Sequence, residues 1–151
     1  MYLAACEELE KHGYRQYEIS NFAKEGFESR HNLIYWDCRE YLGIGAAAHS
    51  FLGGKRFYFP SDAAAFINGA KPINDGEGGS FEEYVMLRLR LTEGLINEGC
   101  KERFGFEIPQ EMRDKSTAFE KNGLLIFDKK GIRLTPEGFL VSNSIIAELL
   151  D

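Results

Sequence analysis

Two short segments between residues 30 and 50 hold most of the side chains that could do chemistry. The first, residues 30–36, reads Arg-His-Asn-Leu-Ile-Tyr-Trp and includes the only tryptophan of the chain. A neutral imidazole is a good ligand for iron, and aromatic rings can stack on a planar macrocycle or a base. If the segment is helical, His31 and Tyr35 share one face. Asn32 and Trp36 then share the next face. The alternative is a histidine and a tryptophan that belong to a domain core.

The second segment, residues 43–50, reads Gly-Ile-Gly-Ala-Ala-Ala-His-Ser. It fits the G-x-G-x-x-A pattern of dinucleotide-binding folds, but a helix should open inside that pattern, and Gly53-Gly54 follows instead. Gly43 and Gly45 have a simpler use, because a backbone without side chains lets a ligand or another strand approach closely. His49 is a second imidazole in this region.

Composition narrows the class of protein. The 151 residues are 44% hydrophobic and 28% charged, as in a folded domain rather than a disordered or fibrous chain. No apolar run reaches the ~20 residues of a membrane-spanning helix, and no secretory signal stands at the start. We therefore expect a cytoplasmic protein without a membrane span. The net charge of -6 argues against nucleic acid as a partner, because binding phosphates needs clustered Lys and Arg.

The clearest break in composition is residues 75–80, Asp-Gly-Glu-Gly-Gly-Ser, where we place a linker. Before it, we expect a helix over residues 2–12, strands over 14–23, 41–50 and 56–59, and a helix over 61–68. After it, we expect helices over 81–94, 97–105 and 109–123, a hairpin of 124–128 with 132–134, and a closing helix from Pro136. This order is typical of a winged-helix domain. The helix over 109–123 carries three acids and three bases, so we expect it not to bind DNA.

Several separated motifs resemble one protein family. Residues 17–23 (Tyr-Glu-Ile-Ser-Asn-Phe-Ala), 29–36 and 41–50 are similar to segments of the radical SAM proteins known as oxygen-independent coproporphyrinogen III oxidases. Within that family the match is to the HemW-like branch, which is regarded as a group of haem chaperones. The resemblance continues through residues 91–94, 133–138 and 142–145, and so covers nearly the whole chain.

The resemblance implies an α+β fold. Residues 1–74 would be the last strands and helix of a partial radical SAM α/β barrel, 75–80 a linker, and 81–151 a winged-helix-like domain. Family members carry a C-x-x-x-C-x-x-C motif that holds a 4Fe–4S cluster, with S-adenosylmethionine on the fourth iron. Cys6, Cys38 and Cys100 do not have that spacing. We therefore expect a fragment of such a protein that is not catalytically competent alone, which leaves open whether the chain is an enzyme.

The resemblance also points to a ligand. True coproporphyrinogen dehydrogenases resemble Gln-Gly-Tyr where this chain has residues 31–33, and they have an apolar residue in place of His49. Those residues lie beside S-adenosylmethionine in the enzymes, and two imidazoles there favour haem binding instead. We expect His31 to ligate the iron. The other expected haem-binding residues are Asn32, Tyr35, Trp36, Gly43, Gly45 and His49. The family often has a glycine where this chain has Ala47.

The expected function is that of a fragment of a haem chaperone, which binds haem or a porphyrin and passes haem to acceptor proteins. One alternative is a fragment of an oxygen-independent coproporphyrinogen III dehydrogenase, and another is a winged-helix interaction module. We also expect a homodimer. A truncated barrel would leave the edge of a strand around Tyr17 to Phe22 unpaired, and two copies could cover that edge.

Overall fold

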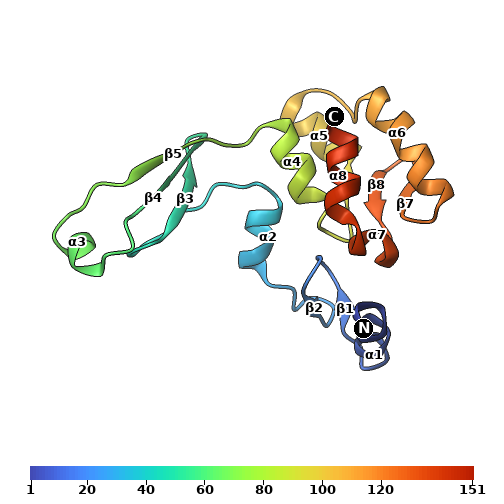
Figure 1. Cartoon of the computed structure of the whole chain (residues 1–151), viewed down its shortest axis with the longest axis horizontal. Helices are drawn as coiled ribbons and strands as arrows, with labels where there is room; N and C mark the ends of the chain where they lie inside the picture. Colours follow the sequence, from blue (N-terminus) through green and yellow to red (C-terminus); the bar gives the residue numbers. More distant parts are fainter.

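An N-terminal helix and hairpin, a projecting three-stranded arm and a larger C-terminal domain make up the computed structural model, which describes residues 1–151 (Figure 1). The expected mixture of helices and strands is confirmed. The chain exposes 9421 Å² to solvent, and most of its fully buried side chains belong to the C-terminal domain. None of its helices is both long and apolar enough to span a membrane.

The N-terminal region differs from the expected continuous strand over 14–23. Helix α1 (Tyr2–Lys11) is followed by a hairpin of β1 (Arg15–Gln16) and β2 (Phe22–Ala23). The residues between them turn, since Ser20 and Asn21 favour turns over extended backbone. The edge that we expected to be open is paired. The Ile19 N–H donates to the Arg90 carbonyl at 2.8 Å, and the Thr92 N–H donates to the Tyr17 carbonyl at 3.2 Å.

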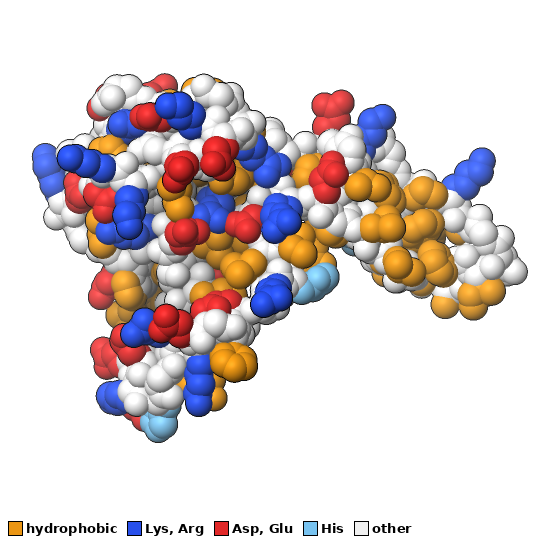
Figure 2. Space-filling view, turned by 180° about the vertical axis from the view of Figure 1, so that it is seen from behind, with side chains coloured by type: hydrophobic (Ala, Val, Ile, Leu, Met, Phe, Trp, Pro, Cys, Tyr) orange, Lys and Arg blue, Asp and Glu red, His pale blue; other side chains and the backbone are white.

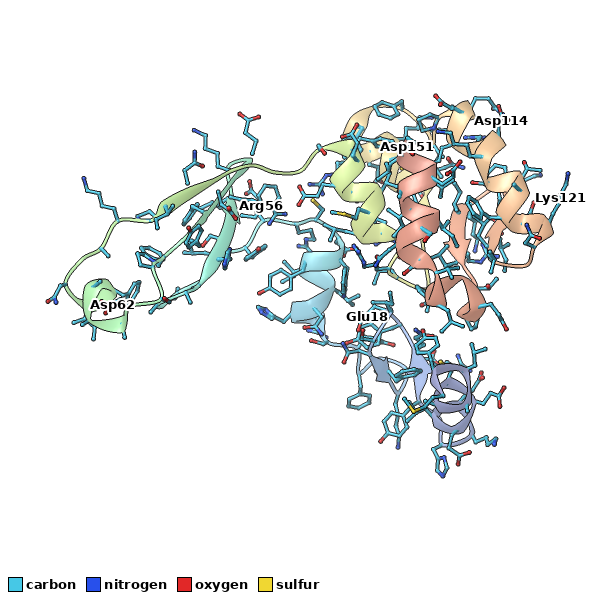
Figure 3. All side chains as sticks on the ribbon, viewed as in Figure 1. Glu18, Arg56, Asp62, Asp114, Lys121 and Asp151 are labelled. Atoms are coloured by element: carbon cyan, nitrogen blue, oxygen red, sulfur yellow. The ribbon has the colours of Figure 1, made fainter.

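Glu18 lies at this junction between the hairpin and the C-terminal domain (Figure 3). Its side chain is completely buried. One carboxylate oxygen, Oε2, accepts a hydrogen bond from the Ser20 N–H at 3.2 Å. The other, Oε1, has no hydrogen-bond partner. A buried carboxyl group therefore lies in the contact between the hairpin and the C-terminal domain, and no basic side chain bonds to it.

Helix α2 (Arg30–Trp36) leads from the hairpin to the arm. The Ser29 hydroxyl caps it by accepting a hydrogen bond from the Asn32 N–H at 3.3 Å. The helix ends at Asp37, and Cys38 follows with a positive φ of 50°. A residue in that conformation cannot continue a right-handed helix, so the chain changes direction there.

The arm is an antiparallel sheet of β3 (His49–Leu52), β4 (Lys55–Tyr58) and β5 (Ile73–Glu77), in that order across the sheet. Helix α3 (Ala63–Ile67), capped by Asp62, lies in the connection between β4 and β5. The strand expected over 41–50 is partly wrong: residues 49 and 50 begin β3, but residues 42–48 form a loop, with Gly45 at φ +122° and Ala47 at φ +60°. The segment expected as a linker, 75–80, is also partly wrong, since residues 75–77 belong to β5.

The C-terminal domain follows the expected order of elements closely. Its helices are α4 (Phe81–Arg88), α5 (Asn97–Phe104), α6 (Gln110–Lys121), α7 (Pro136–Leu140) and α8 (Ser142–Leu150). Its strands are β6 (Leu95–Ile96), β7 (Leu125–Phe127) and β8 (Gly131–Leu134), arranged in the order β6-β8-β7. The closing helix is split at Val141, and β6 was not expected. Leu89, Leu95, Leu125, Ile132 and Ile145 form the centre of the core.

Candidate functional site

The exposed face of α2 carries the first candidate group. The Tyr35 hydroxyl lies 2.7 Å from Nε2 of His31, and the two rings meet edge to face at 4.8 Å. The expectation that these residues share one helix face is confirmed. Tyr35 also contacts Tyr41, with ring centroids 4.5 Å apart. Because Tyr35 engages Nε2, the nitrogen of His31 that is left to bind a further group is Nδ1.

The other candidate residues of α2 are less accessible. Asn32 and Trp36 are both half-buried, and the backbone N–H of Asn32 is used by the helix cap. Their side chains therefore lie beside the exposed histidine face rather than on it. The rings in direct succession from His31 are those of Tyr35 and Tyr41.

Gly43 and Gly45 lie in the loop that precedes β3. The Gly43 N–H donates to the Ser50 hydroxyl at 3.0 Å. A Cβ atom on Gly43 would stand 2.2 Å from the carbonyl oxygen of His49, so this position has room for glycine alone. No helix opens within residues 43–48, which removes the structural context of a dinucleotide-binding pattern. Gly43 thus allows two parts of the chain to approach each other closely, which is a simpler use of the glycine than dinucleotide binding.

His49 belongs to a different element from His31. Its ring stacks on Tyr58 of the neighbouring strand, with centroids 5.1 Å apart and planes inclined by 23°. Its Nδ1 lies 3.8 Å from a carboxylate oxygen of Asp75 on β5. No hydrogen bond or ring contact joins it to His31. The two imidazoles therefore sit in separate surroundings within this chain, one on α2 and one on the arm.

The C-terminal end of α2 is held by a buried arginine of α4. Arg88 donates from Nε to the Gly94 carbonyl at 3.1 Å, and its two terminal nitrogens donate to carboxylate oxygens of Asp37 and of Glu93. Burial opposes the charge of Arg88, but the hydrogen bond to Glu93 and the neighbouring negative charges raise its pKa above the ordinary value. Arg88 is therefore a fixed cation.

A second arginine reaches the same helix end from α5. Arg103 donates to the main-chain oxygen of Asp37 at 3.2 Å and to that of Cys38 at 2.6 Å. Neither arginine was predicted from the sequence. Arg88 did leave a signal, because it stands four residues after Tyr84 and seven after Phe81, on the apolar stripe of its helix. A charged residue at such a position indicates a buried charge that needs an ion-pair partner.

The three cysteines do not come together as ligands of an iron–sulfur cluster. Cys38 and Cys100 are buried, whereas Cys6 is half-buried on α1. Burial raises the pKa of the Cys100 thiol to about 11, so it stays protonated where a metal ligand must be a thiolate. No group of three or more His, Cys, Asp and Glu side chains is placed to hold a metal ion. The residues present thus do not fit an iron–sulfur cluster.

A broad hollow of the surface lies away from both histidines. It has a volume of about 830 Å³ and is formed in the C-terminal domain by β6, α5 and the turn between β7 and β8. Side chains of both charges line it, among them Glu98, Lys101 and Lys130. Apolar side chains gather instead on the arm, as Figure 2 shows. The two candidate histidines, His31 and His49, are exposed and line no part of this hollow.

Comparison with known proteins identifies the class. Residues 81–141 match the HemN C-terminal domain family. The fold resembles that of coproporphyrinogen III oxidase (HemN) from Escherichia coli, a radical SAM enzyme, with a TM-score of 0.66 and 16% identity over 97% of this chain and 39% of that one. The C-terminal part of the chain and its fold are thus similar to those of the coproporphyrinogen oxidase-like radical SAM proteins, as the sequence motifs implied.

Its curated relatives define the branch. The chain is 33% identical over 99% of its length to the heme chaperone HemW of Lactococcus lactis and, equally, to that of Bacillus subtilis. It is 32% identical over the same share to a mitochondrial radical S-adenosyl methionine domain-containing protein of Bos taurus. The resemblance to the HemW-like branch is confirmed. The chain spans 41% and 42% of the length of the two bacterial relatives.

Proposed function

We propose that this chain forms the haem-binding part of a HemW-type haem chaperone in the cytoplasm, with His31 as the iron ligand. The observation that carries the proposal is the His31–Tyr35 pair on the exposed face of α2. Metal-binding histidines usually hold one ring nitrogen in a hydrogen bond and ligate through the other. The Tyr35 hydroxyl, 2.7 Å from Nε2, meets this requirement. Haem is the cargo here, and acceptor proteins are the partners that would receive it.

The surrounding residues have distinct roles in this proposal. Tyr35 orients the imidazole, and Tyr41 extends the aromatic surface next to it. Trp36 and Asn32 support the helix face from its half-buried side. Gly43 and Gly45 shape the loop that leads from this face to the arm, and His49 is a second imidazole that a porphyrin could reach from β3. The exposure of His31 suits cargo that must be released as well as bound.

Replacing His31 by alanine is expected to weaken haem binding by at least about tenfold, because the axial bond supplies much of the affinity for the iron. The measurement is a haem titration that follows the Soret band. His12→Ala is the matched control, since His12 is the third histidine and contacts only Glu8 of its own helix. Unchanged spectra and affinity for His31→Ala would reject His31 as the ligand. His49→Ala would then be titrated.

The alternative of a dehydrogenase fragment rests on the likeness to HemN, which comprises the fold and the match of residues 81–141 to the HemN C-terminal domain family. We infer that the chain by itself assembles no cluster and cleaves no S-adenosylmethionine. The three thiols are distributed over α1, the end of α2 and α5, and the two buried ones have raised pKa values. Radical chemistry would therefore need residues beyond these 151.

The C-terminal domain is proposed to be a winged helix that contacts proteins. Its three helices, its sheet order β6-β8-β7 and its closing helices support that assignment. Two of the three bases of α6 are already paired, as Arg113 bonds to Glu107 at 3.1 Å and Lys115 to Glu111 at 3.3 Å. This pairing, with the acidic net charge, favours a protein partner over nucleic acid.

We also propose that the chain forms a homodimer through its arm. A compact monomer of this mass exposes about 7,800 Å², whereas this chain exposes 9421 Å². Strand β5 pairs with β4 on one side and leaves its other edge open. Four exposed apolar side chains lie on or beside the arm: Ile44, Leu52, Ile67 and Ile73. Pairing of β5 with its copy around a two-fold axis would cover the edge and Ile73 on it.

The dimer is tested by light scattering across a dilution series. Ile73→Lys, on β5, is expected to shift the chain to monomer at every concentration because it places a charge in the proposed contact. Leu140→Lys is the control, since Leu140 is 56% exposed on α7, outside the arm. A wild-type chain that stays monomeric at high concentration would show that the arm is not a dimer contact.

A further inference from the structure

Helix α2 cannot set its own orientation. It has seven residues, which is well below the ~12–15 residues that an isolated helix needs to be even marginally stable in water. None of its residues is fully buried, so its apolar contacts are limited. It packs against α4 of the C-terminal domain. The direction in which His31 points must therefore come from contacts that other elements make with α2.

The C-terminal end of α2 provides those contacts. The last carbonyls of a helix have no partners within the helix, and the end carries a partial negative charge. Arg103 places a positive charge at this end and donates to the main-chain oxygens of Asp37 and Cys38, the two residues that follow the helix. Arg88 adds a bond to the Asp37 carboxylate.

The geometry of Arg88 makes this contact rigid. Its side chain is only 7% exposed, and all three nitrogens are bonded, to Gly94, Asp37 and Glu93. Two of these partners, Gly94 and Glu93, follow α4 within the C-terminal domain, whereas Asp37 belongs to the end of α2. A planar guanidinium bonded on three sides fixes the relative position of its partners. Arg88, Arg103 and Asp37 together form an arginine clamp on the end of α2.

We propose that Arg88, Arg103 and Asp37 are positioning residues of the His31 site, through which the C-terminal domain fixes the orientation of α2. None of the three is a ligand of the cargo. Their removal changes the site through α2, by freeing the helix to change its angle against α4. The haem readout of this inference rests on the proposed function, but its second readout, the fluorescence of Trp36, does not.

The sharpest variant is Asp37→Asn. It removes the charge that links α2 to Arg88, while Arg88 keeps Gly94 and Glu93 within the C-terminal domain. Trp36 is the only tryptophan of the chain and lies next to Asp37, so its emission reports on α2 alone. Without haem, Asp37→Asn is expected to shift this emission to longer wavelength and to increase its quenching by acrylamide about twofold, as the half-buried ring becomes accessible. Haem affinity is expected to fall about fivefold.

Asp128→Asn is the matched control. It makes the same chemical change at a carboxylate that bonds to an arginine, Arg133, at 2.7 Å in the β7–β8 hairpin, outside the contact of α2 with α4. Both readouts should stay at wild-type values in this control. Arg103→Met is the second test variant, because Arg103 is exposed and its loss does not empty the core. It should change Trp36 quenching in the same direction as Asp37→Asn.

The outcomes separate the two proposals. Wild-type Trp36 quenching in both Asp37→Asn and Arg103→Met would overturn the arginine clamp, whatever the haem titration shows. Increased quenching together with unchanged haem binding in His31→Ala would sustain the clamp and reject His31 as ligand. Increased quenching with wild-type haem affinity in Asp37→Asn would overturn the positioning role, because α2 would then move without effect on the cargo.

Discussion

Replacing Gly94 by alanine is expected to destabilise the C-terminal domain by more than about 3 kcal/mol. Gly94 has φ +78°, and a Cβ atom there would stand 2.2 Å from the Ile132 carbonyl oxygen and 2.7 Å from the Arg133 Cα. Both obstacles are backbone atoms of β8, so they cannot rotate away. The alanine would therefore push β6 from β8 and open the sheet. Urea unfolding followed by far-UV circular dichroism measures the loss.

Gly105→Ala isolates the effect of the clash. Gly105 has nearly the same backbone conformation, φ +81°, but a Cβ atom there would meet no other part of the chain within 4 Å. Only the left-handed conformation is then penalised, which costs roughly 1–2 kcal/mol. Similar losses in the two variants would show that conformation alone matters and that β6 is free to shift. A much larger loss for Gly94→Ala would establish the close contact of β6 with β8.

Arg88→Met is expected to cost about 2–4 kcal/mol of unfolding free energy. The change removes three hydrogen bonds and leaves the Gly94 carbonyl without its donor. The cost stays below the top of the range for buried ion pairs because Asp37 and Glu93 are 34% and 63% exposed and regain water. Thermal and urea unfolding curves provide the measurement.

Arg90→Met is the control for Arg88→Met. Arg90 lies two residues further along the chain and bonds to Met86 and Asn143 near the surface, where hydrogen bonds contribute little. Its replacement should cost under about 1 kcal/mol. If both arginines cost the same, the buried position of Arg88 has no special importance for stability.

The helices of the C-terminal domain could be predicted because their ends are encoded locally. Ser80 accepts from the Glu83 N–H, Thr135 accepts from the Gly138 N–H, and Gly105 ends α5 in the left-handed conformation. Strand β6 could not be predicted, because two residues have no periodicity. Its existence depends on pairing with β8, which lies some 36 residues further along the chain.

The candidate site shows the same division between local and distant determinants. The spacing of four between His31 and Tyr35 was sufficient to place both on one helix face. The loop over 42–48 was mistaken for a strand because small and apolar residues suit either conformation. Its shape follows from contacts with β3, such as that of Gly43 with His49. The pairing of Arg88 with Asp37, 51 residues apart, is likewise a product of the tertiary fold.

Burial of the Glu18 carboxyl affects which part of the molecule unfolds first. Docking the N-terminal hairpin onto the C-terminal domain removes this group from water, and Oε1 gains no hydrogen bond in return. The docked arrangement is held by main-chain bonds such as that from Ile19 to Arg90 and by the packing of Tyr2 and Ile19 against the core. Undocking returns the carboxyl to solvent and recovers its hydration, while the core around Leu89 stays closed. The hairpin and α1 thus form a separate unit of local unfolding, whose amides exchange with solvent before those of the C-terminal core.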